Sequence, residues 1–315
     1  MPKRSPFTLM FLFFGGLVIS VVYGCVCMTF IWHVEGSSES MAFFKAYTTE
    51  FKTIISLGLI LGTALVVKYA QHDLPEMIQN IFTAEELEHT DYEVNRESYM
   101  NVRKTVEFGA QVTVVAFVIF RYCQFRLSGT GWYFMMAAVC AEYLFASFVG
   151  RKLRYAAMMV HSLLDIKLKR NLFKDRELDN INWYVNVAST LTIIFVYVHV
   201  TCYYDGPFAY NTVAGQSVRI FLILPAIMAT PVLLIFNFYP REVLRKLYSK
   251  SIDLEIDSLK RNMNNEKLNA FEKRSYLIEF NKMCRDELRY SFQLALTDLP
   301  IGITILAMVI QALLK

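Results

Sequence analysis

The segment "FTLMFLFFGGLVISVVYGCVCMTFIW", from Phe7 to Trp32, decides the fold because it is a long apolar run without a charged residue. An α-helix needs about 20 such residues to cross a hydrocarbon layer of roughly 30 Å. The preceding Lys3 and Arg4 resemble the start of a signal peptide. The apolar run is longer than the usual 7–15 residues of a signal peptide, and no small-x-small cleavage site follows cleanly. We therefore predict an uncleaved membrane helix.

The rest of the chain repeats this pattern. Of its 315 residues, 55% are hydrophobic and 15% are aromatic, which is the composition of a membrane protein with several spans. Six or seven segments approach the length that a spanning helix needs. The predicted spans are Phe7–Trp32, Thr53–Tyr69, Thr105–Phe120, Trp132–Val149, Trp183–Tyr204, Val218–Phe238 and Phe292–Leu314.

The basic residues predict the orientation. If the N-terminus is inside, the inner segments 2–6, 68–104, 150–182 and 239–291 contain 2, 4, 8 and 12 Lys and Arg residues, or 26 of the 32. Such a bias places these segments in the cytoplasm. The net charge of +4 mainly reflects this topology, so we expect no direct binding of nucleic acid.

The predicted fold class is all-α, a polytopic bundle with a cytoplasmic antiparallel helical hairpin. We expect a transmembrane region over residues 1–240 with helical loops at 70–104 and 150–182, a hairpin over 241–291, and a last membrane segment over 292–315. In the hairpin, apolar residues recur every three or four positions on both sides of Asn264-Asn265, as in two amphipathic helices. The first arm carries Leu244, Tyr248, Ile252, Ile256 and Leu259 as candidate docking residues, and the second carries Leu277, Phe280, Cys284, Leu288 and Phe292.

The two cytoplasmic loops have distinct signatures. In the acidic loop 70–104, Thr83 and Glu86 have the spacing of a capping box that starts a helix, and we expect this stretch to be solvated. The loop 150–182 is basic and looks like a continuation of the fourth span. Basic residues this close to the bilayer attract anionic lipid headgroups.

Small residues form two stripes at four-residue intervals. Such stripes allow helix backbones to approach closely in lipid. The first two predicted spans therefore either pack on each other or present a face to another subunit or a second copy of the chain. The stripes are Gly16, Ser20 and Gly24 in the first span, and Gly58 and Gly62 in the second.

Three polar residues in or near the predicted spans are functional candidates. Glu142 lies near the middle of the fourth span, where a charge is costly, so it is either a proton or cation ligand or a protonated packing residue. Arg121, Arg126 or His199 could pair with it. His199 itself is more typical of a packing residue than of a ligand. Asp298 precedes Pro300 and is expected to cap a helix that restarts where the last segment enters the bilayer.

No catalytic motif is present. The sequence lacks HExxH, GxSxG, P-loop and GxGxxG patterns, and it has no paired intramembrane carboxylates of the protease type. The six cysteines form neither a CxxC pair nor a His/Cys cluster. We therefore expect no enzyme, no cofactor and no metal site.

Two stretches resemble the integrating-conjugative-element membrane proteins of bacterial type IV secretion systems. In the first, Trp32 is followed by Glu35-Gly36 and an amphipathic stretch to Glu50. In the second, Asp165 precedes paired basic residues, Arg176-Glu177 and Tyr184. The similarity covers short pieces of residues 30–50 and 160–240, and the chain departs from the family by a shorter gap before Arg176, extra spans, the hairpin and the last span. The resemblance implies a bacterial inner-membrane component of a conjugation or secretion machine.

These observations favour a non-enzymatic membrane protein that docks other subunits through its cytoplasmic helices. Two alternatives stay open. In the first, the chain forms an oligomeric ion channel or membrane-perturbing effector in which Glu142 lines the pore. In the second, the chain is a proton-coupled transporter in which Glu142 and Asp298 share a cavity.

Overall fold

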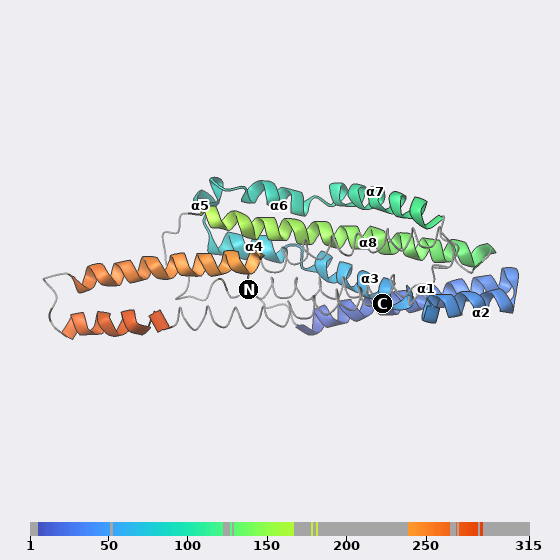
Figure 1. Cartoon of the computed structure of the whole chain (residues 1–315), viewed down its shortest axis with the longest axis horizontal. Coiled ribbons are helices and arrows are strands. Elements are labelled where there is room, and N and C mark those ends of the chain that lie inside the picture. The colour runs from blue at the N-terminus through green and yellow to red at the C-terminus, as the bar shows by residue number, and fades with distance from the viewer. Residues whose placement is uncertain are drawn as a thin grey trace, which may run out of the picture.

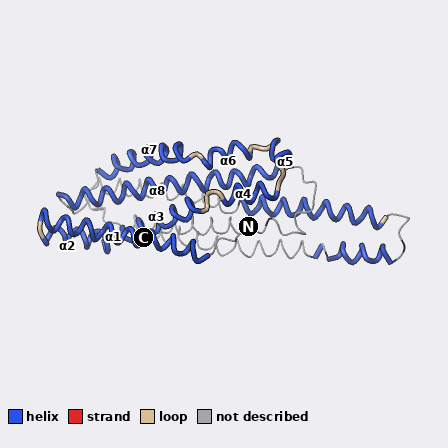
Figure 2. Tube along the Cα trace, turned by 180° about the vertical axis from the view of Figure 1, so that it is seen from behind, coloured by secondary structure: helices blue, strands red, loops and turns tan. Residues whose placement is uncertain are grey.

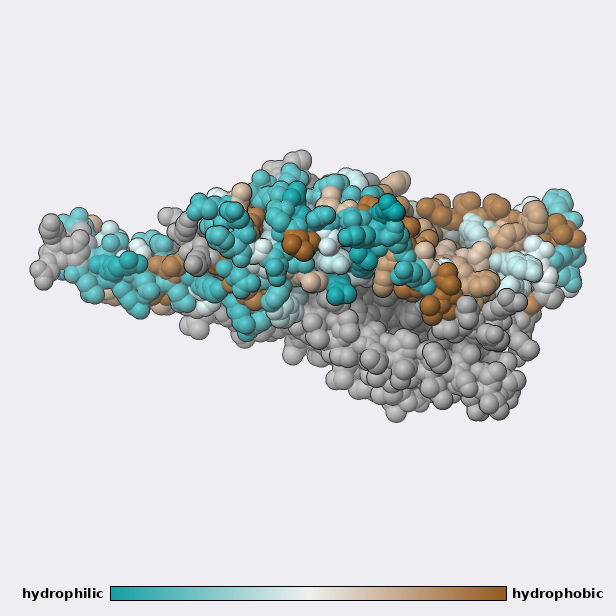
Figure 3. Space-filling model, turned by 90° about the horizontal axis from the view of Figure 1, so that it is seen from above, coloured by the Kyte–Doolittle hydropathy of each residue, from teal (hydrophilic) through white to brown (hydrophobic). Residues whose placement is uncertain are grey.

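A computed structural model describes residues 6–50, 53–121, 127, 129–166, 178, 181, 239–264, 269, 271–282 and 284–285. Over these residues the chain is helical and contains no strand (Figures 1 and 2). The molecule is elongated. We call the described residues of 6–67, 105–121 and 129–150 the apolar half, and the described residues of 68–104, 151–166 and 239–285 the polar half. Figure 3 shows hydrophobic residues gathered on one half of the long axis, and hydrophilic residues over the other half and at the far tip of the first.

Three helices of the described residues are long and apolar enough to cross a membrane, namely Thr8–Glu35, Thr53–Ile81 and Gly129–Asp165. They overlap the first, second and fourth predicted spans and support the prediction of a membrane protein. The third predicted span lies within the helix α7 (Val102–Arg121), which carries Arg103, Lys104 and Glu107 in its first turns and is not among the three. The predicted fifth, sixth and seventh spans lie outside the described residues.

The first two spans form an antiparallel pair. Helix α1 (Pro6–Glu35) has 30 residues and is about 45 Å long. Gly36, with a φ of 103°, then reverses the chain. Helix α2 (Ser37–Lys45) and the π-helical turn η1 (Ala46–Glu50) run back along α1, and α3 (Thr53–Tyr69) continues in the same direction. The amphipathic stretch that ends at Glu50 is therefore a helix that folds back on α1.

Glycines determine how closely α1 and α3 approach. A Cβ on Gly16 would collide with the backbone of Gly58 and Gly62, and a Cβ on Gly62 would collide with the carbonyl of Phe13. These contacts leave room for nothing larger than hydrogen, so Gly16 of the first stripe packs directly on Gly58 and Gly62 of the second.

Helix α8 (Gly129–Ser162) connects the two halves. Its 34 residues extend about 51 Å, well beyond the roughly 30 Å of a hydrocarbon layer. It lies against α3 and α7 in the apolar half and against α6 (Tyr92–Met100) in the polar half. The turn η2 (Leu163–Asp165) follows it. The expectation that the fourth span continues into loop 150–182 therefore agrees with the course of α8 as far as residue 166.

The polar half has its own hydrophobic core. Helix α4 (Asp73–Ile81) buries Leu74 and Ile78, and α6 buries Tyr92 and Tyr99. The short helix α5 (Ala84–Glu88) lies between them, and the predicted capping box is confirmed, because Glu86 N donates to Thr83 Oγ1 at 3.3 Å and Thr83 N donates to Glu86 Oε2 at 2.9 Å. The loop 70–104 is thus less solvated than the sequence suggested.

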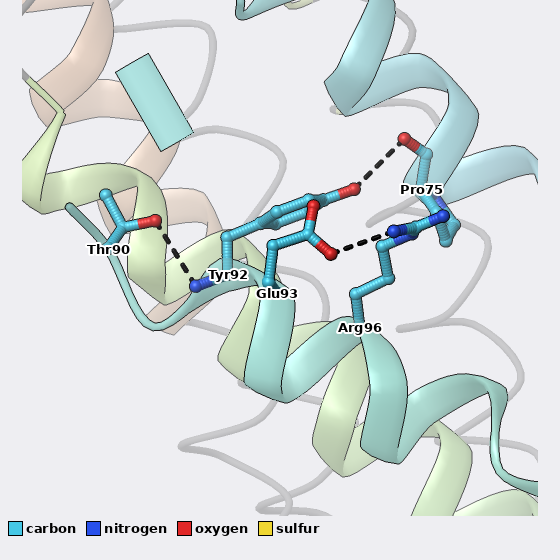
Figure 4. A network of polar contacts seen from close by, with 5 residues as sticks. All are labelled: Pro75, Thr90, Tyr92, Glu93 and Arg96. Atoms are coloured by element: carbon cyan, nitrogen blue, oxygen red, sulfur yellow. Dashed lines mark hydrogen bonds and ion pairs between the residues drawn. The ribbon is translucent and has the colours of Figure 1, made fainter. Parts of the chain in front are cut away.

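Polar contacts of α6 hold this core together (Figure 4). The Tyr92 hydroxyl donates to the carbonyl of Pro75 on α4 at 3.2 Å, and Tyr92 N donates to Thr90 Oγ1 at 3.2 Å. On the exposed side of the same helix, Arg96 pairs with Glu93 at 2.8 Å. Because the phenol of Tyr92 is buried, its pKa is raised to about 12.

Two further helical segments, residues 239–263 and 271–285 with residue 283 undescribed, belong to the polar half. We call them the first arm and the second arm. The first arm is joined to the core, since Leu244 and Tyr248 lie in the same cluster as Leu74 and Tyr92.

The second arm begins at a reciprocal cap, in which Glu272 N donates to Asn269 Oδ1 at 2.8 Å and Asn269 N donates to Glu272 Oε2 at 2.9 Å. Residues 265–268 lie outside the described residues, and the closed antiparallel hairpin stays a prediction.

Candidate functional site

Glu142 lies at the interface of two candidate spans. It is 2% exposed, and the hydroxyl of Ser56 on α3 donates a hydrogen bond to its carboxyl group. Ser56 has a short side chain and lies two residues before Gly58, so this part of α3 is narrow. The sequence thus brings a small hydroxyl donor to the level of the acid on α8. A buried carboxyl group without such a donor would be costly in this environment.

A second polar group lies nearby, between α1 and η1. The Tyr47 hydroxyl donates to the carbonyl of Ser20 at 2.9 Å, and Ser20 Oγ donates to the carbonyl of Ile54 at 2.8 Å. Gly24 makes space for the ring, because a Cβ there would lie 2.6 Å from Tyr47 Cε1. Each of these buried hydroxyl groups is therefore satisfied, and the group acts as a bridge between the two antiparallel segments.

Glu142 is the only acidic residue in segments 8–32, 53–72 and 129–150 of the sequence. Among the described residues, no group of three or more His, Cys, Asp or Glu side chains is placed to hold a metal ion. A single carboxyl group with a hydroxyl donor can hold a proton or join two helices, but it provides no relay by itself.

At the end of α1, a second acidic side chain joins distant segments. Thr130 N and Thr130 Oγ1 both donate to Glu35 Oε1, at 2.6 and 2.5 Å. Thr130 lies in the first turn of α8, where the backbone amides have no partner within the helix. Glu35 therefore caps α8 from α1 and fixes the two helices to each other at this end of the apolar half.

The other intramembrane candidates cannot be placed next to Glu142. His199 and Asp298 lie outside the described residues, as do Arg126 and the side chain of Arg121. Ser56, a hydrogen-bond partner of Glu142, was not predicted from the sequence. The sequence offered a single indication of this role, namely that Ser56 is a polar residue on the span that carries Gly58 and Gly62.

The candidate docking residues of the first arm mostly face inward. Leu244, Tyr248 and Ile252 are 2% exposed or less, and Leu259 is 3% exposed. Ile256 is half-buried. The face that carries them is therefore largely covered within the chain itself.

The second arm has the accessible apolar groups. Its residues Lys273, Tyr276, Phe280 and Cys284 form a half-buried stripe, whereas Phe271 and Ile278 on the opposite side are 81% and 63% exposed. Successive residues of an α-helix are rotated by about 100° around its axis, so the exposed Arg274, Lys282 and Arg285 fall on the same side of the helix as Phe271 and Ile278. We call this surface the outer face of the second arm; it comprises Phe271, Arg274, Ile278, Lys282 and Arg285.

The outer face was not predicted, because docking was expected at the apolar residues of the first arm, which recur every three or four positions. A regular apolar stripe is the side that a helix usually buries, whereas the exposed Phe271 and Ile278 lie on the second arm and belong to no such stripe.

No protein-family model matches this chain, and comparisons with curated proteins and with solved structures find no match.

Proposed function

We propose that this chain is a non-enzymatic membrane protein that holds a helical platform against the membrane and binds a partner protein through the second arm. The observation that carries the proposal is the exposure of Phe271 and Ile278 on a helix whose opposite stripe is half-buried. Large apolar side chains exposed on a helix flanked by charged residues are typical of an interaction surface.

The platform supports this role through its continuous helical structure. Helix α8 runs without interruption from the apolar half into the core of the polar half, and the first arm is joined to that core through Leu244 and Tyr248. If the second arm packs on the first as the predicted hairpin requires, a partner bound there would be held at a defined position relative to the membrane.

The charges of the outer face define the partner. Arg274, Lys282 and Arg285 surround the two apolar residues, and Glu279 lies to one side of them. We propose a partner protein whose contact surface has apolar residues flanked by acidic ones, since complementary charges favour encounter and orientation. In keeping with the resemblance of residues 30–50 and 160–240, we place this protein in the inner membrane as a component of a conjugation or type IV secretion machine.

Affinity purification of the full-length chain from its native membranes tests this proposal. Ile278→Glu on the outer face should remove a co-purifying protein, because it places a negative charge among the apolar contacts. Val94→Glu is the matched control, since Val94 on α6 is 67% exposed but lies elsewhere on the polar half. Equal recovery of all co-purifying proteins from both variants would contradict the proposal.

Proton-coupled transport is a second candidate, which the burial of Glu142 within a membrane helix supports. It requires a second titratable group in the same cavity. The burial does not favour the alternative in which Glu142 lines a pore. Proton flux into liposomes that contain the purified protein, abolished by Glu142→Gln, would support transport, and zero flux for the unmodified protein would exclude it.

A further inference from the structure

Three segments of the chain bring basic residues to the level at which the apolar half ends. The apolar run of α3 ends before Lys68, that of α7 begins after Lys104, and that of α8 ends before Arg151. Lys68 and Arg151 both lie within electrostatic range of Lys152. This level corresponds to the headgroup region of a bilayer that surrounds the apolar half.

Two cations near this level, Lys152 and Arg103, already have partners within the protein. The Lys152 ammonium donates to the carbonyl of Tyr99 and lies 4.9 Å from the centroid of the Tyr99 ring. On α7, Arg103 pairs with Glu107 at 2.8 Å. Neither residue needs an external anion.

Unlike Lys152 and Arg103, the side chains of Arg151 and Arg154 contact aromatic rings and form no ion pair with the described residues. The guanidinium carbon of Arg151 lies 5.7 Å from the ring centroid of Phe108 on α7 and 5.4 Å from that of Tyr155, and that of Arg154 lies 6.0 Å from the Tyr155 centroid. Neither arginine forms an ion pair within the described part of the chain. Arg151 Nε is in addition buried and has no hydrogen-bond partner there.

The two guanidinium groups share the Tyr155 ring as a neighbour, and the aromatic contacts do not neutralise them. An arginine that stacks on a ring keeps its edge N–H groups free, and these groups match the oxygens of a phosphate. Tyr155 adds a hydroxyl that can donate to the same anion. We propose that Arg151, Arg154 and Tyr155 form a binding site for the phosphate of an anionic phospholipid headgroup.

The surface beside the site favours a lipid over free phosphate. Phe108 is 43% exposed, and Val115, two turns further along the same face of α7, is 59% exposed. This apolar strip leads from the arginines toward the middle of the apolar half, so an acyl chain can lie along it while the headgroup meets the two cations. The site is independent of the partner protein proposed above.

Native mass spectrometry of the purified full-length protein, titrated with phosphatidylglycerol in a neutral detergent, tests the proposal. We expect the double variant Arg151→Gln/Arg154→Gln to lose affinity about thirtyfold, which corresponds to about 1 kcal/mol for each cation near the headgroup. The control Arg103→Gln/Lys104→Gln removes the same charge at the same level and should lose about threefold or less. An equal loss in both double variants would show diffuse attraction and would overturn the site.

Two further measurements separate the sources of the anion and guard against misfolding. Inorganic phosphate at millimolar concentration should not displace phosphatidylglycerol, and displacement would assign the site to free phosphate instead. Arg154→Gln alone changes an exposed residue and should leave thermal unfolding unchanged while weakening lipid binding several-fold. Unchanged lipid binding in this folded variant would contradict the proposal.

Discussion

The hydroxyl of Ser56 on α3 donates a hydrogen bond to the carboxyl group of Glu142 on α8, 86 residues away in sequence. Both side chains are buried between helices that are apolar enough to cross a membrane. This contact links the second and fourth predicted spans through a buried acidic group.

Loss of the Ser56 donor should destabilise the bundle. Removing one partner of a buried polar pair costs roughly 1–3 kcal/mol, because the remaining group loses a hydrogen bond that water does not replace. We expect Ser56→Ala to lower the unfolding temperature in detergent. The double variant Ser56→Ala/Glu142→Leu removes both polar groups and should recover part of the loss; a further decrease would contradict this account of the pair.

Gly16 and its neighbour Gly15 should respond in opposite ways to the same substitution. In Gly16→Ala the new Cβ meets the backbone of α3, which cannot move aside, so we expect a loss of about 1–3 kcal/mol. In Gly15→Ala the nearest atom is Leu65 Cδ1 at 4.0 Å, and the better helix propensity of alanine should add up to about 1 kcal/mol. Thermal unfolding of the two variants in parallel measures the difference, and equal effects would show that α1 and α3 do not cross at Gly16.

Tyr92 should make the polar half sensitive to alkaline pH. Burial raises its pKa to about 12, above the value of about 10 for an exposed tyrosine, so the folded state favours the neutral phenol. The resulting stability is fully present below pH 10 and is lost as the pH rises through 12. Tyr92→Phe cannot ionise, and its unfolding midpoint in denaturant should fall less than that of the unmodified protein between pH 9 and pH 11. Parallel decreases in the two proteins would assign the alkaline sensitivity to other groups.

The predicted orientation can be measured with single cysteines in a cysteine-free background. Ser38, exposed where α1 turns into α2, should react with an impermeant maleimide added to intact cells. Ser275, exposed on the second arm, should react only after the membrane is opened. Labelling of Ser275 in intact cells would reverse the topology that the basic residues predict.

The helices of the three candidate spans could be predicted because their hydrophobicity alone marks them. The predicted span Thr53–Tyr69 has the same bounds as α3. The return path of Ser37–Lys45 along α1 could not be predicted, since a nine-residue amphipathic helix has too little apolar length to signal membrane contact.

The core of the polar half was missed for a different reason. Leu74, Ile78, Tyr92 and Tyr99 are separated by acidic residues, so the sequence of loop 70–104 has the average character of a solvated surface. Burial here comes from tertiary contacts with α8 and the first arm, which are distant in sequence. Likewise, nothing in the sequence distinguishes Ser56 from other serines as the partner of Glu142.

Site-specific photo-crosslinking in native membranes tests the central claim most directly. A photoreactive residue at position 278 should form one discrete adduct with another protein, and the charge reversal Arg274→Glu/Arg285→Glu should abolish this adduct because it repels an acidic partner surface. The same photoreactive residue at the buried position 252 should form none. If position 278 gives no adduct in a correctly inserted protein, or if the charge reversal leaves the adduct unchanged, the second arm is not the partner-binding surface.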